Sequence, residues 1–240
     1  MNNIALLLSG GTGVRMGLEV PKQYLEFRGK PIISYSLITF DRHPLIDQII
    51  IVAEKQWREK IDKWLDDFEI NKFAGYADPG ETRQYSIISG LNEVENLGGA
   101  DKVIIHDAAR PLVSDKLITD CLDNLLDCDG VMPVLPAKDT FYLLNEQGFA
   151  SKMLPRSRLA AGQAPEAFDF RKYYKANMSL SREELLKING SSELALKCGL
   201  MVKTIPGDER NIKITTLSDL TLLEAFMEDK NEGSGTGRHS

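Results

Sequence analysis

The chain has 240 residues, of which 42% are hydrophobic and 27% charged, and its formal net charge is −6. That length fits one large domain with a sizeable core. The acidic balance argues against a general nucleic-acid binder, which needs a basic surface, but it leaves room for an anionic small molecule in a locally basic pocket. We expect a cytoplasmic protein that does not span a membrane, because the three cysteines have no disulfide or zinc spacing, and no secretory signal or apolar run of about 18 residues is present.

Residues 1–135 alternate short β-rich runs with helical patterns. This alternation predicts an α/β fold, a Rossmann-like and mostly parallel sheet flanked by helices. The apolar residues of 56–68, including Trp57 and Trp64, share one helical face, so both tryptophans are expected to pack in the core. Strands are expected at 4–8, 46–53, 73–76, 102–106 and 131–134, and helices at 31–40, 56–68, 82–94 and 115–126.

The alternation breaks after residue 135, where two apolar runs surround 145–148 and predict a protruding β-hairpin within an arm over about 139–157. An isolated hairpin is marginal in water, so we expect it to pair with the same hairpin of a second copy in a homodimer; the alternative is that it folds back on its own sheet. Residues 1–230 are expected to form a single domain, and 231–240 a disordered tail. The remaining elements are expected as helices near 170–176, 183–188 and 218–228 and strands near 201–204 and 211–214.

The segment after the first expected strand is rich in glycine and basic residues. Residues 9–17 have the sequence SGGTGVRMG, and PKQ follows at 21–23. Glycines let backbone N–H groups approach phosphates, and Arg15 and Lys22 suit the charge of a triphosphate. The pattern of a P-loop is absent because no Gly-Lys-Ser/Thr closes the turn, and that of a dinucleotide-binding loop fails because Met16 replaces the third glycine. A Gly-rich turn with solvated cations is the alternative.

This loop closely resembles the signature of the nucleotide-sugar pyrophosphorylases, and within them the methylerythritol 4-phosphate and ribitol 5-phosphate cytidylyltransferases. Further segments agree in order and spacing, and the resemblance extends to about Phe226. It implies that the chain transfers the cytidylyl group of CTP to a small polyol phosphate and releases pyrophosphate, with Mg²⁺ as cofactor. The agreeing segments are GETR at 80–83 with Ser86, HDAARP at 106–111, DT at 139–140, QAP at 163–165 and NIKIT at 211–215.

The resemblance also implies roles for individual residues. Arg15, Lys22 and Lys213 would be catalytic and would stabilise negative charge while an acceptor phosphate oxygen attacks the α-phosphorus of CTP. Asp107, at the carboxyl end of an expected strand, is both an acceptor-site candidate and the candidate Mg²⁺ ligand. The other acceptor-site candidates are Arg110, Asp139, Thr140, Arg156 and Asn189, and the CTP-site candidates are Leu8, Ser9, Gly10, Gly11, Thr12, Gly13, Gly80, Glu81, Arg83, Ser86 and Ala108.

Two departures from the family pattern lie at the acceptor side. Asn189-Gly190 stands where the family has Thr-Asp, and Ala164 stands where it has a threonine. The same fold could therefore use another nucleotide or sugar phosphate, or bind a nucleotide without turnover. Arg156 matches the arginine that reaches the acceptor across the dimer interface in relatives. His106 is expected to be structural, because attack by an ionised phosphate needs no general base.

Overall fold

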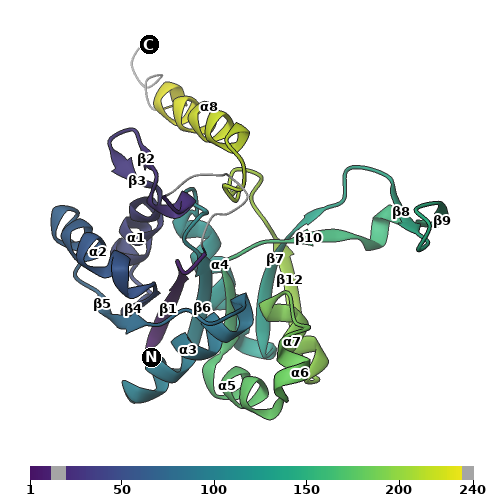
Figure 1. The fold of residues 1–240 in the computed structure, drawn as a ribbon, viewed down its shortest axis with the longest axis horizontal. Coiled ribbons are helices and arrows are strands. Elements are labelled where there is room, and N and C mark those ends of the chain that lie inside the picture. The colour runs from purple at the N-terminus through teal and green to yellow at the C-terminus, as the bar shows by residue number, and fades with distance from the viewer. Residues whose placement is uncertain (12–19, 234–240) are drawn as a thin grey trace, which may run out of the picture.

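The computed structural model describes residues 1–11 and 20–233, and its centre is an eight-stranded, mostly parallel sheet (Figure 1). The strand order is β10-β7-β11-β6-β1-β4-β5, with β12 beside β7. β11 is antiparallel to both β6 and β7, and β10 is antiparallel to β7. This arrangement confirms the α/β class expected from the sequence. The strands are β1 (Asn3–Leu8), β4 (Gln48–Val52), β5 (Phe73–Ala77), β6 (Lys102–Asp107), β7 (Gly130–Pro136), β10 (Ala160–Gly162), β11 (Glu166–Asp169) and β12 (Val202–Pro206).

Helices cover both faces of the sheet, which is why its central strands contain continuous apolar runs instead of an alternating pattern. In β1, Ala5 and Leu7 pack with α1, α2 and α4, whereas Ile4 and Leu6 pack with α3, α5, α6 and α7. A smaller cluster joins α8 to Ile32 and Ile214. The helices are α1 (Ile32–Arg42), α2 (Lys55–Asp67), α3 (Arg83–Asn96), α4 (Asp115–Asp123), α5 (Phe170–Ser179), α6 (Arg182–Leu185), α7 (Ser191–Lys197) and α8 (Ser218–Gly233).

Local sequence explains where several of these elements begin. Thr82 caps α3 by accepting a hydrogen bond from the Tyr85 amide, and Ser114 caps α4 in the same way. Trp57 and Trp64 of α2 pack against Tyr24, with ring centroids 4.7 and 5.8 Å apart, which agrees with their expected packing role. The short elements are 3-10 turns η2 (Lys22–Tyr24), η3 (Asn124–Asp127) and η4 (Arg156–Arg158) and strands β2 (Glu26–Phe27) and β3 (Lys30–Pro31).

Two expectations for the later part of the chain are wrong, and three elements there were not expected. Residues 211–214 are not a strand; they run along the loop after β6, where the Ile214 amide donates to the Ala109 carbonyl at 2.8 Å. The helix α7 and the antiparallel strands β10 and β11 were not anticipated, because their segments are short and lack a clear period. The expected tail at 231–240 begins too early, since α8 continues to Gly233; residues 234–240 lie outside the described part of the chain.

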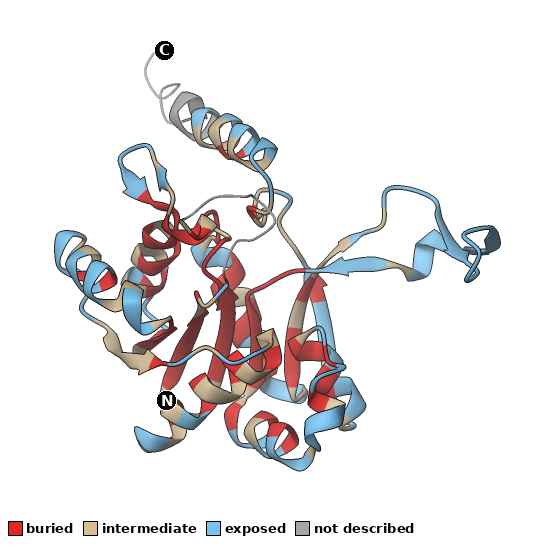
Figure 2. Cartoon of the chain, in the orientation of Figure 1, coloured by how far each residue is buried: buried red, intermediate tan, exposed pale blue. Residues whose placement is uncertain are grey.

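The expected hairpin is present and projects from the body as an arm (Figure 2). Its strands β8 (Phe141–Leu144) and β9 (Ala150–Leu154) form a separate two-stranded sheet, and among the described residues they pair only with each other. Folding back on the central sheet is therefore excluded within this chain. The arm exposes large apolar side chains, including 71% of Phe149 and 56% of Tyr142. Over the described residues, no helix combines the length and apolar character needed to cross a membrane.

Candidate active site

The main cavity opens at the carboxyl ends of four neighbouring parallel strands, where open α/β sheets bind ligands. It has a volume of about 480 Å³, within the range of small-molecule sites. Segments after β1, β4, β5 and β6 supply most of its walls, and Lys22 and Lys213 add two cations. The lining residues are Leu8, Gly10, Gly11, Lys22, Gln23, Glu54, Pro79, Gly80, Glu81, Thr82, Arg83, Ser86, Asp107, Ala109 and Lys213.

The described start of the Gly-rich loop is held in shape by neighbouring residues. The Gln23 side chain donates to the carbonyls of Ser9 at 2.6 Å and Gly11 at 2.8 Å. Gly10 lies so close to Pro79 that an added Cβ would be 2.3 Å from the proline Cβ. Gln23 therefore orients the loop backbone. Sequence analysis quoted it in the PKQ segment without assigning it a role.

The candidates Thr12, Gly13 and Arg15 lie outside the described residues. Ser9 is buried, and its hydroxyl donates to the Tyr24 hydroxyl at 2.8 Å, while that hydroxyl donates to the Ser9 carbonyl at 3.1 Å. The Ser9 side chain therefore supports the loop from within. Arg15 and Lys22 are the two cations expected in this segment. Lys22 begins η2 and lines the cavity.

The turn after β5 forms the opposite wall. Ser86 accepts from the Gly80 amide at 3.1 Å and donates to the Thr82 carbonyl at 3.0 Å, so it closes this turn while lining the cavity. A Cβ on Gly80 would lie 2.3 Å from Tyr85 Cβ, which explains the glycine. Glu81 also lines the cavity and pairs with Arg182 at 3.1 Å.

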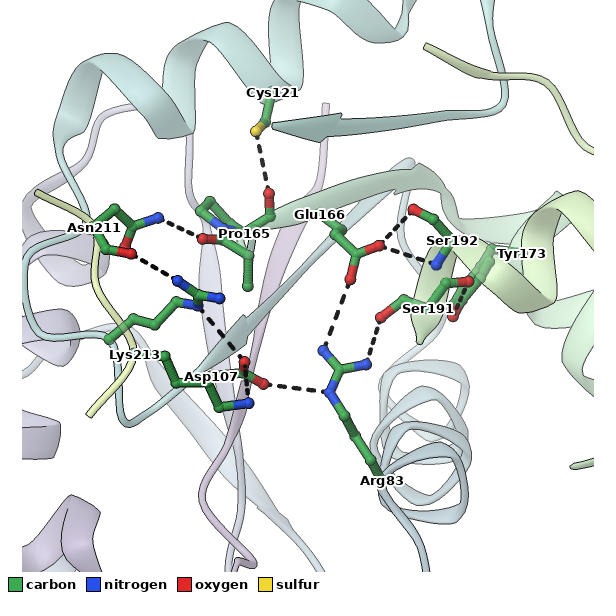
Figure 3. A network of polar contacts seen from close by, with 12 residues as sticks. Arg83, Asp107, Cys121, Pro165, Glu166, Tyr173, Ser191, Ser192, Asn211 and Lys213 are labelled. Carbon is green, nitrogen blue, oxygen red and sulfur yellow. Dashed lines mark hydrogen bonds and ion pairs between the residues drawn. The ribbon is translucent and has the colours of Figure 1, made fainter. Parts of the chain in front are cut away.

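Asp107 is the electrostatic centre of the site (Figure 3). Its carboxylate lies 2.8 Å from Lys213 Nζ, 3.3 Å from Arg83 Nε and 3.7 Å from Arg110 Nε. Burial alone would raise the pKa of Asp107, but the charges of Arg83 and Lys213 outweigh it and hold the pKa well below its usual range. Asp107 is therefore ionised, and it fixes the positions of the surrounding cations.

A second cavity of about 270 Å³ adjoins the first. Arg83, Asp107 and Lys213 line both cavities, and we call these three residues the shared wall. Of the expected acceptor-site residues, Asp107, Arg110 and Asn189 line this second cavity. Its other lining residues include Met132, Gln163, Ala164, Glu166, Gly190, Ser192 and Glu193.

Other expected site residues lie elsewhere. Asp139, Thr140 and Arg156 belong to the arm and line neither of these two cavities. Arg156 begins η4 after β9 and donates to the Lys138 carbonyl at 3.1 Å. Ala108 is fully buried below the site, and its neighbour Ala109 lines the cavity instead.

His106 points into the core and not into either cavity. It is fully buried, its Nε2 lies 3.0 Å from the Arg110 carbonyl, and its ring packs 5.2 Å from Phe40 between centroids. Burial lowers the pKa of His106 to about 4, so the imidazole is neutral at physiological pH. These contacts agree with its expected structural role.

Glu166, Ser191 and Ser192 were not among the residues predicted for the site. Glu166 lies on β11, is 7% exposed, and accepts hydrogen bonds from the amide and hydroxyl of Ser192. Ser191 accepts from Arg83 at 2.8 Å. The only signal was a departure from the family pattern in both segments, at Gln163–Glu166 and Asn189–Ser192, because the contacts join residues remote in sequence.

The chain matches the family model for 2-C-methyl-D-erythritol 4-phosphate cytidylyltransferase over residues 4–229. It belongs to this family. The protein is therefore a cytidylyltransferase, which is a kind of nucleotidyltransferase.

Curated relatives carry two different acceptor names. The 2-C-methyl-D-erythritol 4-phosphate cytidylyltransferase of Clostridium perfringens is 34% identical over 227 residues, covering 93% of this chain and 98% of the relative. The ribitol-5-phosphate cytidylyltransferase of Lacticaseibacillus paracasei is 28% identical over 229 residues, covering 94% and 98%. The crystal structure of the 4-diphosphocytidyl-2C-methyl-D-erythritol synthase of Anaerococcus prevotii has the same fold, with a TM-score of 0.82 at 24% identity, covering 95% of this chain and 96% of that one.

Proposed function

We propose that this cytidylyltransferase joins the cytidylyl group of CTP to a small polyol phosphate, of the 2-C-methyl-D-erythritol 4-phosphate or ribitol 5-phosphate type, and releases pyrophosphate. The observation that carries the proposal is the shared wall of Arg83, Asp107 and Lys213 between two adjoining cavities. The larger cavity, beside the Gly-rich loop, suits the nucleotide. The smaller suits the acceptor, whose phosphate then meets the α-phosphate of CTP at the wall.

The proposed reaction is an in-line displacement at phosphorus. An oxygen of the acceptor phosphate forms a bond to the α-phosphorus, the bond to the bridging oxygen of the β-phosphate breaks, and pyrophosphate leaves with the electron pair. The acceptor phosphate is already ionised near neutral pH, so positioning and charge stabilisation suffice. Lys22 and Lys213 supply positive charge at the cavity, and Asp107 holds the Lys213 ammonium in place beforehand.

We propose Mg²⁺ as the cofactor, held mainly by the substrate phosphates. The described residues contain no cluster of three or more His, Cys, Asp or Glu side chains that could hold a metal ion. Mg²⁺ commonly uses one or two carboxylates together with phosphate oxygens, and Asp107 is a carboxylate of this kind at the shared wall. The three cations around Asp107 reduce its own attraction for a metal, so the fit is to an ion that arrives with CTP. When bound, Mg²⁺ would neutralise triphosphate charge.

We further propose a homodimer that forms through the arm. Asp139, Thr140 and Arg156 line neither cavity of their own chain, and the arm exposes Phe149 and Tyr142. An identical arm would cover these apolar side chains by two-fold symmetry. Arg156 would then face the acceptor cavity of the second copy.

Pyrophosphate release tests this function directly. The purified protein is assayed with each of CTP, UTP, ATP and GTP against a panel of polyol and sugar phosphates, with Mg²⁺ or with excess chelator. We expect release with CTP and a polyol phosphate, dependence on the divalent ion, and a CDP-polyol product by mass spectrometry. Equal turnover of ATP and CTP would contradict the selection of CTP, and full activity in chelator would contradict the Mg²⁺ proposal.

A further inference from the structure

Arg83 connects three elements at the shared wall (Figure 3). Its Nε faces Asp107 of β6 at 3.3 Å, its Nη1 donates to Ser191 Oγ of α7 at 2.8 Å, and its Nη2 lies 3.8 Å from Glu166 Oε1 of β11. A guanidinium has donors in a fixed plane, so partners on several sides determine its orientation as well as its position. Arg83 is therefore held in one arrangement between the two cavities.

Glu166 is a partner of Arg83 whose side chain is itself held on both carboxylate oxygens. One carboxylate oxygen, Oε2, accepts from both the amide and the hydroxyl of Ser192, and the other, Oε1, faces Arg83. Its backbone is fixed as well, since β11 pairs with β6 on one side and with β7 on the other. Glu166 is thus a rigid anion that links the start of α7 to the guanidinium.

Charge balance gives Glu166 a second effect. Asp107 faces three cations, namely Lys213, Arg83 and Arg110. Asp107 binds Arg83 through Oδ1 and Lys213 through Oδ2, and Glu166 adds a second negative charge beside Arg83. Arg83 therefore lies between two carboxylates, while Lys213 remains bound to the other oxygen of Asp107.

We propose that Glu166 is a positioning residue that acts through Arg83 to set the affinity for both substrates. The inference rests on the proposed function, because it takes the two cavities as the CTP and acceptor sites. Of the two cavities, Glu166 lines only the second. It is expected to affect CTP binding because Arg83, which it holds, lines both cavities. A residue that only contacted the acceptor would not change CTP binding.

The first test is Glu166→Gln, which keeps the size of the side chain and removes its charge. We expect the KM for CTP and the KM for the acceptor each to rise about tenfold, because loss of the charge removes the ion pair at 3.8 Å and weakens the hydrogen bonds from Ser192. The Kd of CTP measured without acceptor should rise equally. The matched control is Asp129→Asn, which removes a carboxylate of similar exposure that pairs with Lys172 and the Met201 amide away from both cavities. Asp129→Asn should change the melting temperature but leave the KM for CTP and the KM for the acceptor unchanged.

A double-mutant cycle shows whether Glu166 acts through Arg83. In an Arg83→Met background, Glu166→Gln should change the KM for CTP by less than about twofold, since the group it orients is gone. Equal effects in both backgrounds would overturn the inference, as would an unchanged KM for CTP in the single variant.

If Glu166→Gln does not fold, Ser192→Ala replaces it and should raise both KM values by a smaller factor; unchanged values there would also overturn the inference. Absence of pyrophosphate release by the wild-type enzyme with CTP would instead contradict the proposed function.

Discussion

The ionisable residues near the site differ in their surroundings. Lys22, Lys213 and Arg83 line a cavity, whereas His106, adjacent to Asp107 in sequence, is turned into the core and kept neutral by burial. Along β6, the neighbouring side chains of His106 and Asp107 point to opposite faces, so Asp107 faces the cavities and His106 faces the core. Residue type and sequence position therefore mislead unless the direction of the side chain is known.

At this scale we expect Lys213→Ala to lower kcat by about a hundred- to a thousandfold, as with other single groups that stabilise transition-state charge. The fold should persist, because Asp107 keeps Arg83 and Arg110 as partners. Steady-state kinetics measures the loss and circular dichroism checks the fold. Lys203→Ala, on an exposed position of β12, is the control and should keep full activity. A Lys213 variant with most of its kcat would refute the assignment.

The buried His106 makes stability depend on pH. Its pKa is lowered from 6.5 to about 4 in the folded protein, so between these values the unfolded chain binds more protons than the folded one. Stability is therefore unaffected above about pH 6.5 and falls as the pH decreases, by about 2 kcal/mol at about pH 5. Urea unfolding at about pH 7.5 and about pH 5 should show this loss in the wild type and a smaller one in His106→Gln. Equal losses in both proteins would show that His106 does not titrate in this way.

At the scale of elements, the larger cavity depends on the close approach of two loops. Residues 9–11 and 78–80 follow β1 and β5, which lie on either side of β4 in the sheet. They touch where Gly10 meets Pro79. Gln23 and Ser86 then hold the backbone of each loop by side-chain hydrogen bonds. The site is thus positioned by loop contacts that rest on a rigid sheet.

Gly10→Ala should separate these loops. The added methyl would lie 2.3 Å from Pro79 Cβ, and a proline ring cannot rotate away. We expect a loss of about 1–3 kcal/mol, the usual cost of overpacking, and a lower melting temperature. Gly11→Ala is the matched control, since a Cβ there meets nothing within 4 Å, and its melting temperature should change little. Equal melting temperatures for the two variants would exclude a tight contact at Gly10.

At the scale of the whole molecule, the arm is the part whose apolar side chains a single chain leaves exposed. It extends away from the helices that cover the sheet, and its apolar side chains are exposed (Figure 2). Arg156 lies at its base, in η4. Activity should therefore depend on assembly if the second copy receives this arginine.

Mixing two inactive variants tests the shared site. Arg156→Ala and Lys22→Ala homodimers should each be nearly inactive, for different reasons. After subunit exchange, half of the dimers are hybrids with one intact site in two, so about a quarter of wild-type activity should return. Sedimentation measures assembly and pyrophosphate release measures activity. A fully active monomer, or no recovery despite confirmed exchange, would exclude the shared site.

The elements and motifs that depend on local patterns could be predicted from the amino-acid sequence. The continuous apolar runs of β1, β4 and β6 reflect burial on both faces, and the helices between them follow from period and caps such as Thr82. The Gly-rich segment and HDAARP marked the ends of strands and so indicated the nucleotide cavity. The hairpin was also predictable, because its turn residues separate two short apolar runs.

The contacts between segments that are remote in sequence could be seen in the three-dimensional structure but not in the sequence. β11 inserts antiparallel between β6 and β7, and residues 211–214 run beside the loop after β6 without joining the sheet. The same long-range packing brings Glu166 to Arg83 and leaves Arg156 outside both cavities of its own chain. Such contacts leave no period in the sequence, because they depend on which surfaces remain uncovered after the local elements have formed.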